Sequence, residues 1–319
     1  MADPVRGRHR AVAVIVLATA ALVGSVARVP SPAVQLWALV AGVAVGLPRG
    51  ALDQPAAAAR LGRRFGRRWP LPFFGYYLGL AALVVLIWSA EPRVALALFL
   101  GLSILHFGLG DTKADDKLRP VAVAAHGGAP IIVPALAHPA EVASIFEALA
   151  PGGGDLVGLL GGPAALAWAG AVVTLPVARR PWMRAEAWGP VVELLAVVAA
   201  FAVLPPLLAF ALYFGILHAP RASLAEATTA GGPPGAALRR LLRQALPASL
   251  AASAAAGVAF ALLRDARGEH AAALSVIFVG LAALTVPHMA LGPVLRRAER
   301  RAALPRHAPG VAAAGVRGS

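Results

Sequence analysis

Long apolar runs recur along almost the whole chain, and they constrain the fold more than any other feature of the sequence. They lie at residues 11–27, 33–48, 71–90, 93–110, 118–137, 155–178, 188–204, 205–220, 246–263 and 271–295. A helix needs about 20 residues to cross the ~30 Å hydrocarbon core of a bilayer, and several of the runs reach that length. The sequence therefore predicts an all-α, polytopic membrane helix bundle with about ten transmembrane helices.

The composition supports this class and narrows the chemistry. Hydrophobic residues make up 59% of the chain and charged residues 14%, against about 25% charged in a soluble domain. Because there are no cysteines, disulfides, thiolate ligands and cysteine nucleophiles are excluded, and any metal must be held by His and carboxylate groups. The net charge of +14 does not indicate nucleic-acid binding, because the basic residues form short clusters between the apolar runs.

These basic clusters predict the topology. If the long run from 188 to 220 is broken at Pro205 and Pro206, where proline ends a helix, ten helices place every basic cluster on the same side. The positive-inside rule then puts both termini in the cytoplasm. We expect a multi-pass protein of the cell membrane, with a single transmembrane domain at 11–295 between a basic tail at 1–10 and a basic, disordered tail at 296–319.

Four histidines share one depth in the predicted bundle. His106, His126, His218 and His288 each fall within roughly 5–12 Å of the cytoplasmic boundary at ~1.5 Å of rise per residue. Glu193, within the seventh span, lies in the same layer. Ionisable groups inside membrane spans usually face an interior site or a partner. The layer is therefore the strongest functional signal in the residues themselves.

Two interpretations of this layer stay open. Neutral imidazoles suit Fe, Zn or Cu, and a buried carboxylate commonly orients a ligating histidine. Alternatively, each histidine donates a hydrogen bond to a backbone carbonyl and holds helices together. The sequence has no C-x-x-C, H-E-x-x-H, G-x-S-x-G or Walker pattern, so the hydrolases and nucleotide enzymes that use those motifs are not supported.

Several short motifs resemble the Brp/Blh-type beta-carotene 15,15'-dioxygenases over about residues 40–292. They are "GLPRGALD" (46–53), "LHFGLGD" (105–111), the stretch around His138, "LPPLLAFALYFGILHAPRA" (204–222) and "VPHMAL" (286–291). The resemblance implies a membrane enzyme that cleaves beta-carotene with molecular oxygen to two retinals. It further implies a histidine-ligated non-haem Fe(2+), an apolar tunnel for the polyene within the lipid bilayer, and a downstream rhodopsin that would accept the product.

The resemblance also implies roles for individual residues. His106 and His218 occupy metal-ligand positions, and His288 and His126 are candidates for further ligands. The remaining expected site residues comprise a catalytic set and a set lining the substrate channel. The catalytic set is Asp111, Glu193 and Arg221, and the channel set is Tyr213, Phe214 and Phe107.

Two expected ligand histidines are replaced in this chain. Arg49 and Ala222 stand where the family pattern has histidines, and Gln54 replaces another. Arginine stays protonated and has no lone pair for a metal. Either an Arg49–Asp53 ion pair fills the vacated site, leaving a member that binds or carries a carotenoid or retinoid without iron, or the site is rebuilt.

A rebuilt site would join His106 and His218 to His126 or His288. Two histidines and one carboxylate suffice for non-haem Fe(II), and the carboxylate would be Asp53, Asp111 or Glu193. A solute or proton transporter is a weaker interpretation, because no inverted repeat is evident.

Overall fold

The computed structural model describes residues 4–27, 29–51, 53–112, 116–179, 188–229 and 234–303. Throughout these segments the chain is helical and contains no strand. The helices are α1 (Pro4–Gly24), α2 (Pro32–Ala51), α3 (Asp53–Phe65), α4 (Pro70–Ala90), α5 (Pro92–Asp111), α6 (Arg119–Ala137), α7 (Pro139–Leu149), α8 (Leu156–Leu159), α9 (Ala165–Arg179), α10 (Trp188–Val203), α11 (Pro206–Leu212), α12 (Ala219–Thr229), α13 (Pro234–Arg267) and α14 (Glu269–Ala303). Short 3₁₀ turns and two π-helical segments, Leu160–Ala164 and Tyr213–His218, complete the order.

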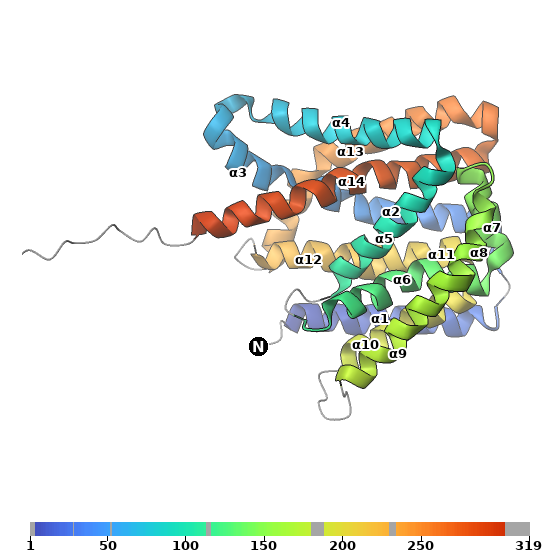
Figure 1. Ribbon diagram of the computed structural model, residues 1–319. Helices are drawn as coiled ribbons and strands as arrows, with labels where there is room; N and C mark the ends of the chain where they lie inside the picture. Colours follow the sequence, from blue (N-terminus) through green and yellow to red (C-terminus); the bar gives the residue numbers. More distant parts are fainter. Residues whose placement is uncertain are drawn as a thin grey trace, which may run out of the picture.

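The predicted all-α membrane bundle is confirmed. Within the described residues, 8 helices are long and apolar enough to cross a membrane, and two shorter apolar helices, Pro32–Pro48 and Trp188–Val203, accompany them. Together they correspond to the runs found in the sequence. α1 begins and α14 ends at the same end of the bundle (Figure 1). That this end faces the cytoplasm stays a prediction from the basic clusters.

The predicted break at the double proline is also observed. α10 ends at Val203 and α11 begins at Pro206, with Pro205 extended at φ −49° and ψ 139°. The two helices then pack on different neighbours, α10 on α1 and α6, and α11 on α2. Proline ends the first helix because it lacks an amide donor and clashes with the preceding turn.

Several helices extend beyond the predicted spans. Residues 53–65 form α3, a separate amphipathic helix, and α13 begins at Pro234 rather than near residue 246. α14 continues through the basic residues to Ala303, because Ala, Arg and Glu are strong helix formers. The predicted tail at 1–10 is helical from Pro4. The rest of the C-terminal tail lies outside the described residues.

α6 lies at the centre of the bundle, and α5 packs closely against it. In the apolar 18-residue stretch of α6, 67% of the residues are buried. A side chain at Gly108 of α5 would collide with the Val123 carbonyl, and one at Gly127 of α6 with the Ile104 carbonyl. These glycines therefore allow the two backbones to approach, as small residues do in membrane proteins. In contrast, no residue in the corresponding apolar stretch of α13 is buried.

Candidate functional site

Three of the four predicted histidines face one cavity. His106 comes from α5, His218 from the π-helical segment and His288 from α14. The Nε2 atoms of His106 and His218 lie 3.4 Å apart, and the His288 ring lies 6.0 Å from the His106 ring. We call this space of about 60 Å³ the histidine cavity. His126 is also buried, on α6, but it is not part of the cavity lining.

The π-helical segment carries three of the predicted site residues, Tyr213, Phe214 and His218. Residues Tyr213–His218 continue directly from α11 into α12. A π-helical turn widens the helix and shifts the side chains that follow, which is why such turns often mark functional sites. Here Phe214 stacks on the His218 ring with centroids 5.9 Å apart, and Phe107 of α5 meets the same ring edge-on at 4.9 Å. The imidazole is thus held between aromatic rings.

Asp111 fixes His218 from behind. Its Oδ1 lies 3.2 Å from His218 Nδ1, and its Oδ2 accepts a hydrogen bond of 2.6 Å from the Tyr213 hydroxyl. An ionised carboxylate is only an acceptor, so His218 must donate from Nδ1. In the neutral imidazole, Nε2 then carries the lone pair, and this atom lies 3.4 Å from His106 Nε2. A carboxylate in this position orients a metal-ligating histidine and selects its tautomer.

A chain of ion pairs extends from Asp111 across four helices. Arg221 of α12 donates to Asp111 Oδ1 at 3.1 Å and to Glu193 Oε2 of α10 at 2.5 Å. Arg10 of α1 donates to the same Glu193 oxygen at 3.0 Å. Two cations thus balance two carboxylates whose side chains are only 2–3% exposed. Buried ion pairs need this kind of full pairing to offset the loss of hydration.

The predicted catalytic residues therefore lie together, but outside the lining of the histidine cavity. Asp111, Glu193 and Arg221 form the ion-pair chain and do not belong to the lining of the histidine cavity. Of the three predicted channel residues, Phe107 and Phe214 line that cavity, whereas Tyr213 is bonded to Asp111.

Sequence reasoning missed the contribution of α1. Arg10 pairs with Glu193, and His9 Nε2 lies 2.9 Å from the carbonyl oxygen of Ile216, two residues before His218. Both residues had been counted only as part of a basic tail. One signal in the sequence pointed to them: they directly precede an apolar run, at the predicted depth of Glu193.

Replacement of Arg10 by glutamine is expected to destabilise the protein by about 1.5–3 kcal/mol, the range for a hydrogen bond to a charged group. Glu193 would keep only Arg221 as a cationic partner. The measurement is thermal unfolding of detergent-purified protein. Arg8→Gln, at an exposed position on the same helix, is the matched control. Equal midpoints for the two variants would contradict a role for Arg10 in the ion-pair chain.

The replaced ligand positions flank the histidine cavity. Gly46 and Leu47 of α2 line it, and Arg49 follows on the same helix. Ala222 is half-buried and lies four residues after His218, so the two positions share a helix face. The side chains of Arg49 and Asp53 lie outside the described residues. The predicted ion pair between them is therefore not tested.

The histidine pair fits part of a metal site. Two imidazoles bound at about 2.1 Å to one metal ion, with their nitrogens 3.4 Å apart, enclose an angle close to tetrahedral. Among the described side chains, however, no group of three His, Asp or Glu residues is placed to hold a metal ion. A third protein ligand requires His288 to turn toward the pair, or a side chain outside the described set such as Asp53.

Comparison with known proteins connects this geometry to a family. The sequence profile described as beta-carotene 15,15'-dioxygenase matches residues 40–296. A protein of the uncultured marine bacterium 66A03 named beta-carotene 15,15'-dioxygenase is 30% identical over 267 residues, which cover 80% of this chain and 91% of that protein. A probable beta-carotene 15,15'-dioxygenase Blh of Halobacterium salinarum is 29% identical over 291 residues, which cover 82% of this chain and 84% of that protein. No solved structure matches the chain.

Proposed function

Because this chain belongs to the beta-carotene 15,15'-dioxygenase family, we propose that it cleaves beta-carotene at its central double bond with molecular oxygen and releases retinal. The observation that carries the proposal is the array Asp111–His218–His106, in which an oriented imidazole pair faces an apolar cavity. The family name supports the reaction, and the array supports retention of chemistry despite the replacements at positions 49 and 222.

In this proposal, iron would be held by His106 and His218, with His288 as the third imidazole facing the same cavity. Bound Fe(2+) would supply the activation of oxygen. The protein contributes the rest. Asp111 keeps the lone pair of His218 on Nε2, and the rings of Phe107 and Phe214 exclude water and guide the polyene. The bilayer of the cell membrane delivers the substrate, because beta-carotene dissolves in hydrocarbon.

Cells that make beta-carotene provide the direct test. Expression of the wild-type chain is expected to convert the pigment to retinal, measured by chromatography of cell extracts. His106→Ala should leave the pigment intact, because one of the two closest imidazoles is removed. His270→Ala, at an exposed position remote from the cavity lining, should behave as the wild type. Equal retinal from all three proteins would contradict a site at the histidine pair.

The replacements at 49 and 222 favour one second candidate, a member that binds or carries a carotenoid without iron. Arg49 cannot serve as a ligand, and Ala222 has no ligating group. This candidate predicts that the purified wild-type protein holds intact beta-carotene and forms no retinal even when Fe(2+) and oxygen are supplied.

A further inference from the structure

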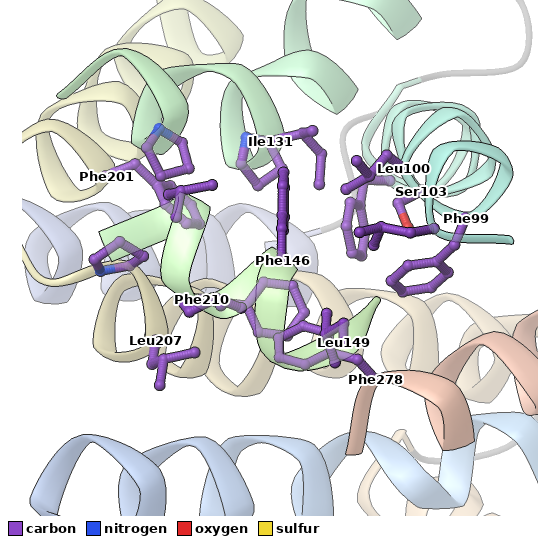
Figure 2. A pocket seen from close by; sticks show the side chains of 17 residues that line it. Phe99, Leu100, Ser103, Ile131, Phe146, Leu149, Phe201, Leu207, Phe210 and Phe278 are labelled. Carbon is purple, nitrogen blue, oxygen red and sulfur yellow. The ribbon is translucent and has the colours of Figure 1, made fainter. Parts of the chain in front are cut away.

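A narrow apolar cavity continues from the histidine cavity toward the opposite end of the bundle. We call it the closed cavity. It occupies about 80 Å³ between α5, α6, α7 and α11, and shares Phe99, Ser103, Phe107 and Phe210 with the histidine cavity. Figure 2 shows Phe99 and Ser103 on one side of this space and Phe201 on the other. Apart from the Ser103 hydroxyl, the side chains that line it are apolar.

The far end of the closed cavity is sealed by α7. Val142, Phe146 and Leu149 on this helix are 2–7% exposed, and all three line the cavity. The indole Nε1 of Trp88 donates to the Leu149 carbonyl at 3.0 Å and anchors the end of α7. From Phe107 back to Leu96 on α5, the cavity follows roughly 16 Å of helix, at ~1.5 Å per residue.

Two larger cavities lie on the other side of the histidine cavity. One of about 740 Å³ lies between α2, α13 and α14, and one of about 560 Å³ between α4, α13 and α14. Both share Leu47 and Leu284 with the histidine cavity. Their linings include exposed apolar side chains, Trp37 at 72% and Leu78 at 63%. In a bilayer these surfaces contact lipid, so this side is accessible to a membrane-dissolved hydrocarbon.

The cavities therefore form an asymmetric path with the histidines in the smallest of them. We propose that a polyene enters from the lipid-exposed cavities and passes His106 and His218 until its leading end meets the floor formed by Val142, Phe146 and Leu149. A conjugated chain is rigid, so the distance from this floor to the histidines selects the double bond that reacts. The three floor residues would thus determine specificity. This inference rests on the proposed function, because it assigns the place of that function's substrate.

The inference predicts how the products change when the floor moves. A deeper floor lets the chain slide further in, so a bond beyond the centre lies beside the histidines. The products become one carbonyl fragment longer than retinal and one shorter, each an aldehyde or, where the cleaved carbon carries a methyl group, a ketone. Leu149→Ala and Phe146→Leu each remove side-chain volume from the floor. Leu86→Ala, at a lipid-exposed position of α4 outside the lining of the four cavities, is the matched control.

Product lengths, measured by mass spectrometry after incubation with beta-carotene, test this. We expect the unequal fragments to form more than about a tenth of the product in at least one floor variant, and retinal alone in the wild type and Leu86→Ala. If both floor variants elute as folded protein and make only retinal, the floor does not select the bond and the inference is overturned.

A binding measurement separates this inference from the proposed function. Val142→Phe fills the closed cavity and should lower at least tenfold the beta-carotene that the iron-free protein binds in the absence of oxygen, read from the visible absorbance. Leu86→Phe, at an exposed position of α4 outside the lining of the four cavities, should bind the wild-type amount. If the wild type forms no retinal but Val142→Phe still loses the pigment, the reaction is wrong and the polyene site is right. If Val142→Phe binds as much pigment as the wild type, or the iron-free wild type binds none, the closed cavity is not the polyene site.

Discussion

Asparagine in place of Asp111 is expected to lower retinal formation about 10–100-fold, the usual effect of removing a carboxylate that orients a metal ligand. The carboxylate only accepts hydrogen bonds, and its Oδ1 lies 3.2 Å from His218 Nδ1. It therefore holds the proton of His218 on Nδ1. Asparagine would keep its oxygen toward His218 and Arg221, which both contact Oδ1, but a neutral amide oxygen accepts a hydrogen bond more weakly than a carboxylate. The proton would be held less firmly on Nδ1, so the tautomer with its lone pair on Nε2, the atom that faces His106, would be less favoured.

The same change also unbalances the ion-pair chain. Arg221 would keep only Glu193 as an anionic partner, so some loss of stability is expected as well. Activity per folded protein separates the two effects. Asp155→Asn removes an exposed ion pair to Arg93 at the other end of the bundle and serves as the control. If Asp111→Asn retains wild-type activity per folded protein, the carboxylate does not orient the histidine.

Restoring the expected histidines is predicted to strengthen iron binding. Position 222 lies four residues after His218 on a continuous helical segment, so a histidine there would face the same side. Position 49 follows Gly46 and Leu47, which line the histidine cavity. The change Arg49→His also removes a permanent cation, which would repel Fe(2+).

The double variant Arg49→His, Ala222→His should therefore retain more iron than the wild type after dialysis against a chelator, by about tenfold or more, and should form more retinal. Arg49→His alone should gain less, because one imidazole is still missing. A control histidine at Ala251, an exposed position on α13, should gain nothing. If the double variant retains no more iron than the wild type, positions 49 and 222 do not correspond to ligand positions.

The sequence was sufficient for the bundle and for the depth of its polar layer. Long apolar runs and the double proline predicted the helices because length and chain breaks are local properties. Depth follows from residue counting, so His106, His218 and His288 were placed at one level. The direction of a side chain around its helix axis depends on packing. For this reason the sequence could not show that His126 is absent from the cavity lining.

The partners of the charged groups were also beyond sequence reasoning. Glu193 was predicted as catalytic, but its carboxylate is paired with Arg221 and with Arg10 of α1. That second pair joins residues far apart in the chain, and α1 lies outside the segment that the family profile matches. The π-helical turn that positions His218 has no sequence signature that we could have used. The charged site is thus a product of tertiary packing.

Iron content tests the central claim most directly. Wild-type protein purified in detergent and loaded anaerobically with Fe(2+) should retain about one iron per chain after desalting, and should form retinal when oxygen and beta-carotene are added. The His106→Ala, His218→Ala double variant should retain almost none, since the closest imidazole pair is gone. If the wild type retains no more iron than this double variant and leaves beta-carotene uncleaved, the histidine pair is not a metal centre, and the chain binds its carotenoid without catalysis.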